Sequence, residues 1–541
     1  MPTVIIDGQE ITIGDKERLN GIQAAARAGA EVPHYCWHPG LSVVASCRMC
    51  LVECGKKDAA TGKITMQPKV VPACQTPATD GTVFITNSPK VKEARAMVEE
   101  DLLLRHPIDC PICDKAGECS LQDYHFEHGR DERRADIQPF SSRRRDLGDT
   151  VTLFVDRCVM CTRCVRFTRE ISGSSELMVI GRGAHEEIDV FRDEQGQIAF
   201  PLDNKLSGNV VDLCPVGALG DKDFLYKQRV WFMKSHDHVC AGCSTGCSIK
   251  VDENQDHVYR LKPRENQQVN GHWMCDEGRY GFAHVHDPQR VIELRRREKD
   301  AYVNVEWSAL PAELDKKLRK AGPLAAVLSP HLTVEEAYLL AKYVKSIDAG
   351  AVFALGPVPI EGEDEKFKSG FTIRAEKCPN RRGVEAVIAR MGGALLNWGD
   401  FLGRLEHESF GAIWVTGGYK TNWNDAATAA KFSATKLLIV QDCFTSPLWD
   451  RADYQLPGAC FAEREGSYVN AADHLQSFQW AIRPPQGVMT EGQLYWQLLS
   501  QTGLYRGRVV LEEVAREIAF FAPALGEMPA VGVSLIKNQL V

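Results

Sequence analysis

The chain has 541 residues, which predicts several domains because single hydrophobic cores rarely grow past roughly 250–300 residues. Apolar residues make up 44% and charged residues 25%, as in ordinary folded proteins, so a disordered chain is excluded. The 64 basic and 72 acidic residues give a net charge of −8, which disfavours nucleic-acid binding because no extended cationic surface is available for phosphates.

The apolar stretches give no sign of a membrane anchor. Residues 1–10 lack the basic and apolar regions of a secretory signal, and the most apolar late segment, 518–536, is interrupted by proline, glycine and glutamate. We therefore expect a cytoplasmic protein that reaches a membrane only through partners. In a reducing cytoplasm, clustered cysteines hold metal more often than they form disulfides.

The first cysteine group lies in a loop-rich segment near the N-terminus. Its members are Cys36, Cys47 and Cys50 in YCWHPGLSVVASCRMC and Cys74 in VPACQTPATDGT. Upstream, residues 4–13 alternate about a DG turn and residues 21–30 suit a helix, which predicts strand–turn–strand–helix. That order resembles a plant-type [2Fe–2S] ferredoxin domain, although ten residues rather than four separate the first two cysteines. We interpret the nearby Cys54 as a non-ligand.

The second group is compact and contains a histidine. The segment HPIDCPICDKAGEC brings together His106, Cys110, Cys113 and Cys119. Four such ligands can enclose an iron–sulfur cluster or a structural zinc ion. If His106 binds a cluster, neutral imidazole replaces an anionic thiolate, so the less negative cluster is easier to reduce.

The third group gives the strongest signal for iron and sulfur. It comprises Cys158, Cys161 and Cys164 in CVMCTRC and Cys214 in DLCPVGAL. Bacterial ferredoxins use the same C-x2-C-x2-C triplet and a Cys-Pro pair, whereas zinc sites usually present cysteines in pairs. This pattern predicts one [4Fe–4S] cluster closed by a remote ligand.

The fourth group is CAGCSTGC, with Cys240, Cys243 and Cys247, completed by Cys275 in WMCDEGRYGF. Its C-x2-C-x3-C-x27-C layout resembles the N-terminal [4Fe–4S] segment of molybdopterin oxidoreductases. In those enzymes a basic residue just after the last cysteine lies between cluster and pterin. Arg279 has a comparable place here and is either that residue or an ordinary ion-paired arginine.

From residue 298 onward the pattern changes to alternating strands and helices. Residues 323–329, 333–347 and 351–356 predict one β–α–β unit, and residues 412–418 and 436–443 with a helix between them predict another. We therefore expect a parallel sheet flanked by helices. Cys378, Cys443 and Cys460 lack metal-ligand spacing here and are interpreted as ordinary thiols, with Cys378 the one that could be proposed as a molybdenum ligand.

Over residues 1–295 the chain resembles the large iron–sulfur subunit, known as the G subunit, of bacterial proton-pumping NADH:quinone oxidoreductase, respiratory complex I. The resemblance rests on the four groups in order, including YCWHPGL, SCRMC, CQTPATDGT, HPIDCPICDKAGEC, RCVMCTRC and LCPVGAL. It implies one [2Fe–2S] cluster at the first group and [4Fe–4S] clusters at the other three. Many family members lack the fourth cluster, including mitochondrial ones, so its intact ligands here indicate a bacterial protein.

The resemblance also implies a multi-domain α+β and α/β fold. The expected domains are a ferredoxin-like β-grasp [2Fe–2S] domain at 1–90, a His/Cys [4Fe–4S] domain at 91–150, a ferredoxin-type [4Fe–4S] domain at 151–232 and a molybdopterin-oxidoreductase-type [4Fe–4S] domain at 233–296. Residues 297–541, with the phrase ADYQLPGACFAEREGSYVN, resemble a molybdopterin oxidoreductase domain. At about 245 residues this part is shorter than a complete enzyme needs, so we expect no bound molybdopterin.

In that family, electrons pass from NADH through an FMN-containing flavoprotein partner into this subunit, then to a ferredoxin-like two-cluster subunit and to quinone. The fourth cluster is regarded as lying off the main path. A small [2Fe–2S] subunit and quinone-proximal subunits complete the peripheral arm, on the cytoplasmic side of the inner membrane. The chain has no G-x-G-x-x-G or P-loop motif and no nucleophile–base grouping, so NADH is expected to bind a partner.

Two other functions remain open from the residues. The same N-terminal clusters occur in iron–sulfur subunits of NAD-linked formate dehydrogenases and hydrogenases, which would require a separate active site. A zinc-stabilised scaffold without redox activity is the other possibility.

Overall fold

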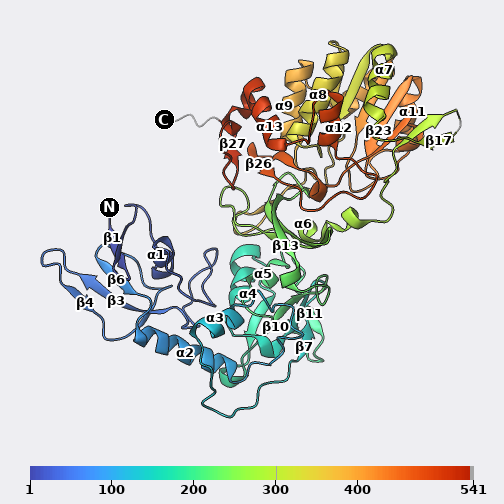
Figure 1. Ribbon diagram of the computed structural model, residues 1–541. Coiled ribbons are helices and arrows are strands. Elements are labelled where there is room, and N and C mark those ends of the chain that lie inside the picture. The colour runs from blue at the N-terminus through green and yellow to red at the C-terminus, as the bar shows by residue number, and fades with distance from the viewer. Residues whose placement is uncertain (300, 537–541) are drawn as a thin grey trace. The chain divides into compact units, whose positions relative to one another are not determined.

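The computed structural model describes residues 1–299 and 301–536, which form two compact units. Unit 1 contains Met1–Met233 and Phe367–Ser369, and unit 2 contains Lys234–Lys366 and the described residues from Gly370 onward. Figure 1 labels the helices and strands of both units. In the described part of the chain, no helix is both long and apolar enough to cross a bilayer.

Unit 1 begins with a mixed sheet in the order β2-β1-β6-β3-β4, with β5 paired to β3. Its strands are β1 (Thr3–Ile6), β2 (Gln9–Thr12), β3 (Leu51–Lys57), β4 (Ile64–Met66), β5 (Val71–Pro72) and β6 (Thr82–Ile85). Asp7 and Gly8 turn β1 into β2 with φ of 49° and 88°, as DG hairpin turns require. Helix α1 (Gly21–Arg27) starts at a capping box on Asn20 and buries Ile22.

The β-grasp arrangement follows from the pairing of these strands. β1 pairs antiparallel with β2 but parallel with β6, and β3 runs antiparallel to β6. The predicted strand–turn–strand–helix order and the ferredoxin-like fold are thereby confirmed. The loop between α1 and β3, together with the residues that follow β5, carries the first cysteine group.

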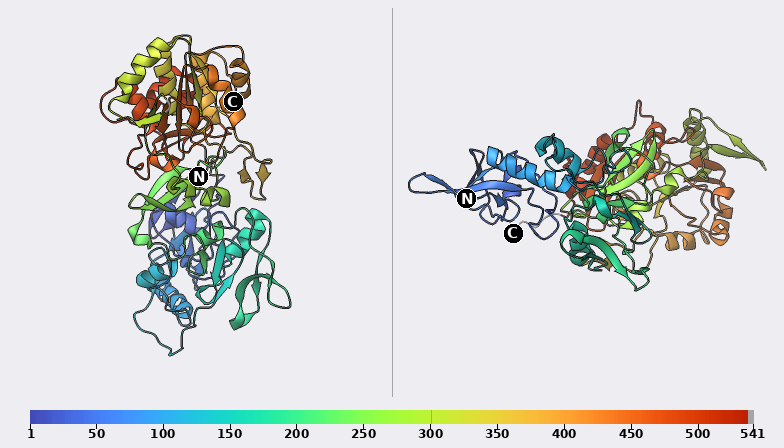
Figure 2. Two further views of the ribbon diagram at one scale, coloured as in Figure 1. Left: turned by 90° about the vertical axis from the view of Figure 1, so that its right-hand side faces the viewer. Right: turned by 90° about the horizontal axis from the view of Figure 1, so that it is seen from below.

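The rest of unit 1 is built from short elements. Helices α2 (Pro89–Leu103) and α3 (Ser120–His128) pack together, and α2 lies along β3, as the right-hand view of Figure 2 shows. The remaining elements are β7 (Arg144–Asp146), β8 (Val151–Phe154), η1 (Val155–Arg157), α4 (Arg163–Phe167), the π-helical turn η2 (Thr168–Ser172), β9 (Leu177–Ile180), η3 (Gly183–His185), β10 (Glu187–Arg192), β11 (Ile198–Phe200), α5 (Asn209–Leu213), β12 (Leu219–Asp221) and η4 (Val230–Phe232). The strands among them form two small sheets, in the orders β12-β8-β7 and β11-β10-β9.

Unit 2 begins with a three-stranded antiparallel sheet that carries the fourth cysteine group. It consists of β13 (Lys234–Val239), β14 (Ser248–Asn254) and β15 (His257–Pro263), followed by α6 (Asp276–Tyr280) and η5 (Ala283–His286). Two further small sheets contain β20 (Glu365–Lys366) with β21 (Thr372–Ile373), and β25 (Gly466–Val469), β26 (His474–Phe478) and β27 (Val533–Ser534).

The main sheet of unit 2 has the strand order β17-β16-β24-β23-β22-β18-β19. Its strands are β16 (Arg295–Glu298), β17 (Ala301–Asn304), β18 (Leu324–Leu328), β19 (Val352–Leu355), β22 (Ala412–Thr416), β23 (Leu437–Asp442) and β24 (Tyr454–Pro457). β19, β18, β22, β23 and β24 are parallel, which confirms both predicted β–α–β units. β16 and β17 add an antiparallel edge that the sequence did not indicate.

Helices cover both faces of this sheet. One core joins alternate strand residues to α7 (Leu310–Ala321), α8 (Val334–Ile347), α9 (Arg381–Gly392), α12 (Glu491–Leu498) and α13 (Gly507–Glu517). The other joins the intervening strand residues to α10 (Trp398–Arg404), α11 (Ala426–Ala430) and the 3-10 helices η6 (Lys431–Ala434) and η7 (Trp449–Arg451). The short 3-10 helices η8 (Phe461–Glu463) and η9 (Ala519–Ala524) complete the unit. The α/β expectation is therefore confirmed.

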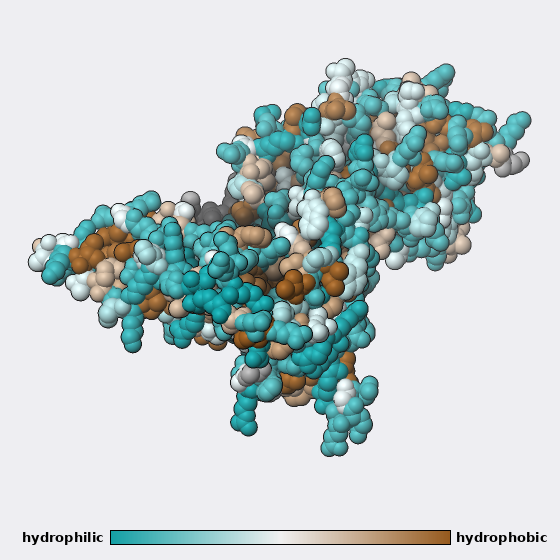
Figure 3. All heavy atoms as spheres, turned by 60° about the horizontal axis from the view of Figure 1, so that its bottom comes forward, coloured by the Kyte–Doolittle hydropathy of each residue, from teal (hydrophilic) through white to brown (hydrophobic). Residues whose placement is uncertain are grey.

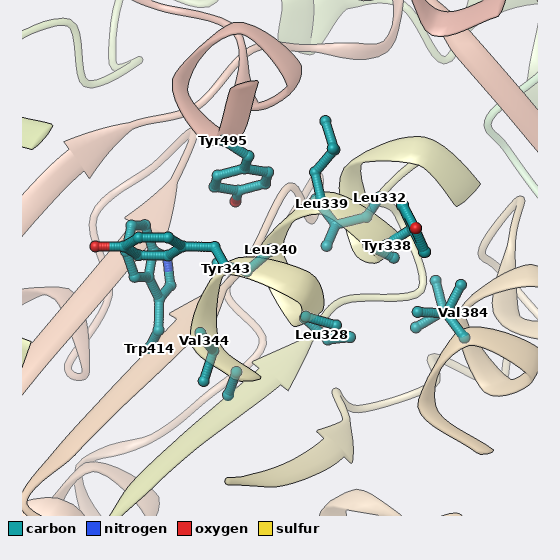
Figure 4. Close-up of a cluster of buried hydrophobic side chains, with 14 of the residues drawn as sticks. Leu328, Leu332, Tyr338, Leu339, Leu340, Tyr343, Val344, Val384, Trp414 and Tyr495 are labelled. Atoms are coloured by element: carbon teal, nitrogen blue, oxygen red, sulfur yellow. The ribbon is translucent and has the colours of Figure 1, made fainter. Parts of the chain in front are cut away.

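The first of these cores is centred on α8. Figure 4 shows Leu340, Tyr343 and Val344 of this helix among Trp414 from β22 and Tyr495 from α12. Tyr343 and Trp414 meet edge to face at 6.5 Å between ring centroids. A capping box on Thr333 begins the helix.

Replacing Leu340 by alanine is expected to lower the free energy of unfolding of unit 2 by about 2–5 kcal/mol, because the side chain is completely buried and the cavity left behind is incompletely filled. Urea denaturation followed by tryptophan fluorescence measures the change. Ser346→Ala, at an exposed position of the same helix, is the matched control. A loss as small as that of the control would contradict this account of the core.

Candidate iron–sulfur sites

The first group lies in the loop between α1 and β3 and in the residues just after β5, next to the β-grasp sheet. Cys36, Cys50 and Cys74 are buried, and the Cys47 sulfur accepts a hydrogen bond from the Cys36 N–H at 3.5 Å. Hydrogen bonds join the Cys36 thiol to those of Cys47 and Cys74, and the Cys74 thiol to that of Cys50. These contacts lower the pKa of Cys36 and raise the pKa of Cys74, so the four sulfur atoms form one connected set.

Cys54 is separate from this set. It lies on β3, and burial alone raises the pKa of its thiol. Its Sγ is 4.0 Å from the Gly55 carbonyl oxygen. The position agrees with its interpretation as a non-ligand.

The second group is more exposed than the first. Cys113 and Cys119 are 9% exposed and Cys110 lies at the surface. Burial, with a smaller contribution from the Cys110 charge, raises the pKa of Cys113, and burial together with the Cys113 charge raises the pKa of Cys119 to about 11. These three thiols therefore lie together, at the start of α3 and in the loop before it.

His106 is connected to these thiols through Arg157. Burial and the Arg157 charge lower the pKa of His106 to about 4, so its imidazole is neutral at pH 7, which is the form that binds metals. The buried Arg157 guanidinium is 2.9 Å from the Asp109 carboxylate, and its charge partly offsets the raised pKa of Cys113. It stacks on Phe154 at 4.0 Å.

The third group surrounds a small cavity. All four cysteines line it, together with apolar side chains that include Leu153, Ile188 and Leu219. Cys158 and Cys161 sit in a loop where Met160 and Thr162 have positive φ, Cys164 is in α4, and Cys214 ends α5. Burial raises the pKa of Cys161 to about 11, so binding of a metal centre must displace protons.

The fourth group surrounds a small cavity in unit 2. Cys240, Cys243, Cys247 and Cys275 line it with Phe371 and Ile373 among the other side chains. The N–H groups of Gly242 and Gly278 donate to the sulfur atoms of Cys240 at 3.4 Å and Cys275 at 3.3 Å. Such bonds stabilise the thiolate form and affect the potential of any cluster held there.

Arg279 is not among the residues that line this cavity. Its guanidinium Nη1 donates to the Leu261 carbonyl oxygen at 3.3 Å, and its Nε is 4.0 Å from the Asp276 carboxylate. This placement favours the ion-paired interpretation over contact with a cofactor.

Two lysines that the sequence analysis missed lie near the fourth group. Burial raises the pKa of Cys240 to about 11, and the Lys420 charge partly offsets this rise. Lys377 pairs with Glu277 at 2.6 Å and interacts with Cys243 and Cys275. Both lysines are more than 100 residues from the cysteines they affect, so no spacing pattern identifies them.

The remaining cysteines lie apart from the four groups. Cys443 and Cys460 are buried with their sulfur atoms 3.9 Å apart, and Cys378 is buried beside Glu376. Throughout residues 1–299 and 301–536, no three histidine, cysteine or acidic side chains converge closely enough to share a single metal ion. The third and fourth groups instead spread their sulfur atoms around cavities.

The second and third groups touch within unit 1. A Cβ added to Gly217, which follows Cys214 in the Cys-Pro segment, would lie 2.1 Å from the Cys113 sulfur. Ser120, next to Cys119, donates its N–H to the Pro215 carbonyl oxygen at 2.9 Å. The glycine therefore allows the loops of the two groups to approach closely.

The first and second groups also meet. Tyr35, beside Cys36, and Tyr124 of α3 are 5.4 Å apart between ring centroids, and Tyr35 donates a hydrogen bond to the buried Glu99 of α2. Burial and the Glu99 carboxylate raise the pKa of Tyr35, and the nearby Cys119 makes a smaller contribution. The three groups of unit 1 thus form one contiguous cluster of loops.

Family models match the chain in the same order as the cysteine groups. They are a 2Fe-2S iron-sulfur cluster binding domain over residues 2–89, the NADH-ubiquinone oxidoreductase-G iron-sulfur binding region over 95–134, and the NADH-quinone oxidoreductase subunit 3 ferredoxin-like domain over 148–220. A molybdopterin oxidoreductase Fe4S4 domain covers 233–287 and a molybdopterin oxidoreductase domain 400–491. The class is therefore a protein with [2Fe–2S]- and [4Fe–4S]-binding domains and a C-terminal molybdopterin oxidoreductase-like domain.

Curated relatives indicate which proteins of this class the chain resembles. The G subunit of NADH-quinone oxidoreductase from Rickettsia felis is 35% identical over 337 residues, which cover 62% of this chain and 47% of that protein. The mitochondrial NADH dehydrogenase [ubiquinone] iron-sulfur protein 1 of Solanum tuberosum is 38% identical over 279 residues, covering 52% and 35%. The resemblance to the G subunit is confirmed, and the chain matches between about a third and a half of the length of these curated relatives.

One solved structure, described as an NAD+-reducing [NiFe]-hydrogenase in the H2-reduced state, is 26% identical and is matched over 42% of this chain and 91% of that chain. Its TM-score is 0.35.

Replacing Gly217 by alanine is expected to displace Cys113 and to lower the iron content of anaerobically purified protein by about four atoms per chain, the content of one [4Fe–4S] cluster. Iron and acid-labile sulfide analysis measures the loss. Gly403→Ala is the control, because its Cβ would meet open space. Full iron content in Gly217→Ala would show that the contact does not restrict the site.

Proposed function

We propose that this chain is the electron-relay subunit in the peripheral arm of a proton-pumping NADH:quinone oxidoreductase. The observation that carries the proposal is the coincidence of two independent patterns. Each cysteine group falls within a segment matched by an iron–sulfur family model, and the cysteines of two groups line a common small cavity. Relatives that match about two thirds of the chain are G subunits of NADH-quinone oxidoreductases.

The proposed ligand sets follow the four groups. Cys36, Cys47, Cys50 and Cys74 would hold a [2Fe–2S] cluster, and three [4Fe–4S] clusters would be held by His106 with Cys110, Cys113 and Cys119, by Cys158, Cys161, Cys164 and Cys214, and by Cys240, Cys243, Cys247 and Cys275. Thiolate donors around an apolar cavity fit such clusters. When bound, these groups supply reversible one-electron transfer.

The chain's own residues contribute placement and shielding. Burial of the third and fourth groups excludes water, and N–H bonds to Cys240 and Cys275 stabilise sulfur charge. The contact of Gly217 with Cys113 keeps two groups of unit 1 close together. No side chain is assigned a catalytic role, because the chemistry belongs to the cofactors.

We further propose that the molybdopterin oxidoreductase-like domain binds no pterin. Asp442, at the carboxyl end of β23, accepts hydrogen bonds from the N–H of Gly418 at 2.9 Å and from Trp423 Nε1 at 2.7 Å. The buried Arg464 pairs with Glu336 at 3.1 Å and Glu491 at 3.6 Å. Ligands of open α/β sheets bind beyond the carboxyl ends of the strands, and here protein side chains bond to one another in that region.

The proposed partners are the flavoprotein subunit that binds NADH and FMN, the small [2Fe–2S] subunit, the two-cluster ferredoxin-like subunit and the quinone-proximal subunits. Ile108 and Ile112 flank the exposed Cys110 and are 78% and 57% exposed, which suits partner docking next to the second group. Figure 3 shows hydrophobic side chains as brown spheres among hydrophilic ones on one face of the molecule. We propose that the complex lies on the cytoplasmic side of the bacterial inner membrane.

Replacing Cys161 by serine in the assembled complex is expected to reduce NADH:quinone electron transfer at least tenfold, because the third group loses a thiolate ligand. NADH oxidation by ferricyanide should remain, since that acceptor takes electrons from the flavoprotein. Cys54→Ser is the matched control and should leave both rates unchanged. Quinone reduction at the normal rate in Cys161→Ser would refute the relay.

An iron–sulfur subunit of an NAD-linked formate dehydrogenase or hydrogenase is the second candidate. It predicts NAD+ reduction by formate or H2 in the purified complex, together with molybdenum, tungsten or nickel on a catalytic subunit. Absence of these activities and metals alongside NADH:quinone activity would exclude it.

A further inference from the structure

One helical segment of unit 1 binds the loop of the first cysteine group. The segment comprises α4 and η2, residues 163–172. Arg163, Arg166 and Glu170 follow one another at intervals of three and four residues, so they share one face of the helix. All three side chains bond to residues 36–42, and we call them the loop-binding face. A π-helical turn inside this segment is a feature often found at functional sites.

Arg166 connects the backbones of two candidate ligands. Its Nη2 donates to the carbonyl oxygen of Cys36 at 2.5 Å and to that of Cys161 at 3.2 Å. Its Nη1 donates to the Ser42 carbonyl oxygen at 2.5 Å. The side chain is only 7% exposed. One buried guanidinium therefore holds the first and third groups together, although Cys36 and Cys161 are more than 120 positions apart.

Arg163 and Glu170 extend this connection on either side. Arg163 lines the cavity of the third group, and its Nη atoms donate to the carbonyl oxygens of Trp37 at 2.6 Å and Leu213 at 3.1 Å. The Glu170 carboxylate accepts the Ser42 N–H at 2.9 Å and the Ser42 hydroxyl at 2.5 Å. The loop from Trp37 to Ser42 is thus fixed at both ends.

The positive charges of the two arginines lie close to both groups. The hydrogen bonds above go to neutral carbonyl oxygens, which satisfy the guanidinium donors without neutralising the charge. A guanidinium stays protonated in proteins, and removing it from water is costly unless negative charge lies nearby. Ligated thiolates at Cys36 and Cys161 would supply that charge.

We propose that Arg163 and Arg166 are positioning residues that hold the first-group loop against the third group and raise the reduction potentials of the clusters at both. The inference rests on the proposed function, since it requires a cluster at each group. Reduction adds an electron to an already anionic centre, and a buried cation stabilises that added charge. The same side chains fix the separation across which the electron moves.

The test uses Arg166→Gln in the assembled complex, with Arg169→Gln as the control because Arg169 is exposed on the same helical segment. Redox titration followed by electron paramagnetic resonance gives the midpoint potential of each cluster. In Arg166→Gln the ratio of reduced to oxidised cluster at a given solution potential should fall about tenfold at the first and third groups, a shift of about 59 mV. The second- and fourth-group potentials and those of the control should not change.

The variant Arg166→Lys distinguishes the effect of the positive charge from the effect of the hydrogen-bond geometry. It also tests the inference if the complex with Arg166→Gln fails to assemble. A lysine keeps the charge but cannot reach three carbonyl oxygens with a planar fork. The ratio of reduced to oxidised cluster at a given solution potential should therefore change by less than about threefold. Amide hydrogen exchange of residues 37–42 should become at least about tenfold faster.

Unchanged potentials in Arg166→Gln, or unchanged exchange in Arg166→Lys, would overturn the inference. Wild-type complex without cluster signals at the first and third groups would instead refute the proposed function. The two failures are therefore distinguishable.

Discussion

The sixteen candidate ligands come mainly from loops and from the ends of short helices, yet most of the thiols are buried. Loops supply few backbone hydrogen bonds of their own, so the surrounding structure must hold them in place. In unit 1 this is done by the β-grasp sheet, by the close contact at Gly217 and by the side chains of Arg157, Arg163 and Arg166. The sulfur atoms are buried, and fixed hydrogen-bond donors and cations must compensate the cost of burying them. The arrangement of the loops in unit 1 follows from this constraint.

Burial also links folding to metal binding. It raises the pKa of Cys119, Cys161 and Cys240 to about 11, so these thiols are protonated at pH 7 until a metal displaces the proton. A bound cluster would then place negative charge beside the buried cations. The sites of unit 1 are best understood as one assembly, in which loading one group affects the electrostatics of its neighbours.

Local sequence patterns predicted those turns, helices and strands whose formation depends on residues close together in the chain. The DG turn at Asp7 and Gly8, the helix predicted at 21–30 and found at Gly21–Arg27, and the β–α–β unit around Thr333 were recognisable, because turn chemistry, capping and hydrophobic period act within a few positions. The cysteine spacing predicted the third and fourth groups, whose members line common cavities. The contacts of Arg166 with Cys36 and of Lys420 near Cys240 join distant segments and leave no periodic signal. The edge strand β16 joins the main sheet by pairing with β24, more than 150 positions later, and was missed for the same reason.

The central claim is that the four groups bind iron and sulfur, and metal analysis of the full chain purified without oxygen tests it most directly. The account predicts about fourteen iron atoms per chain, with matching acid-labile sulfide and broad visible absorption, from one [2Fe–2S] and three [4Fe–4S] clusters. About four zinc atoms per chain without visible absorption would contradict it.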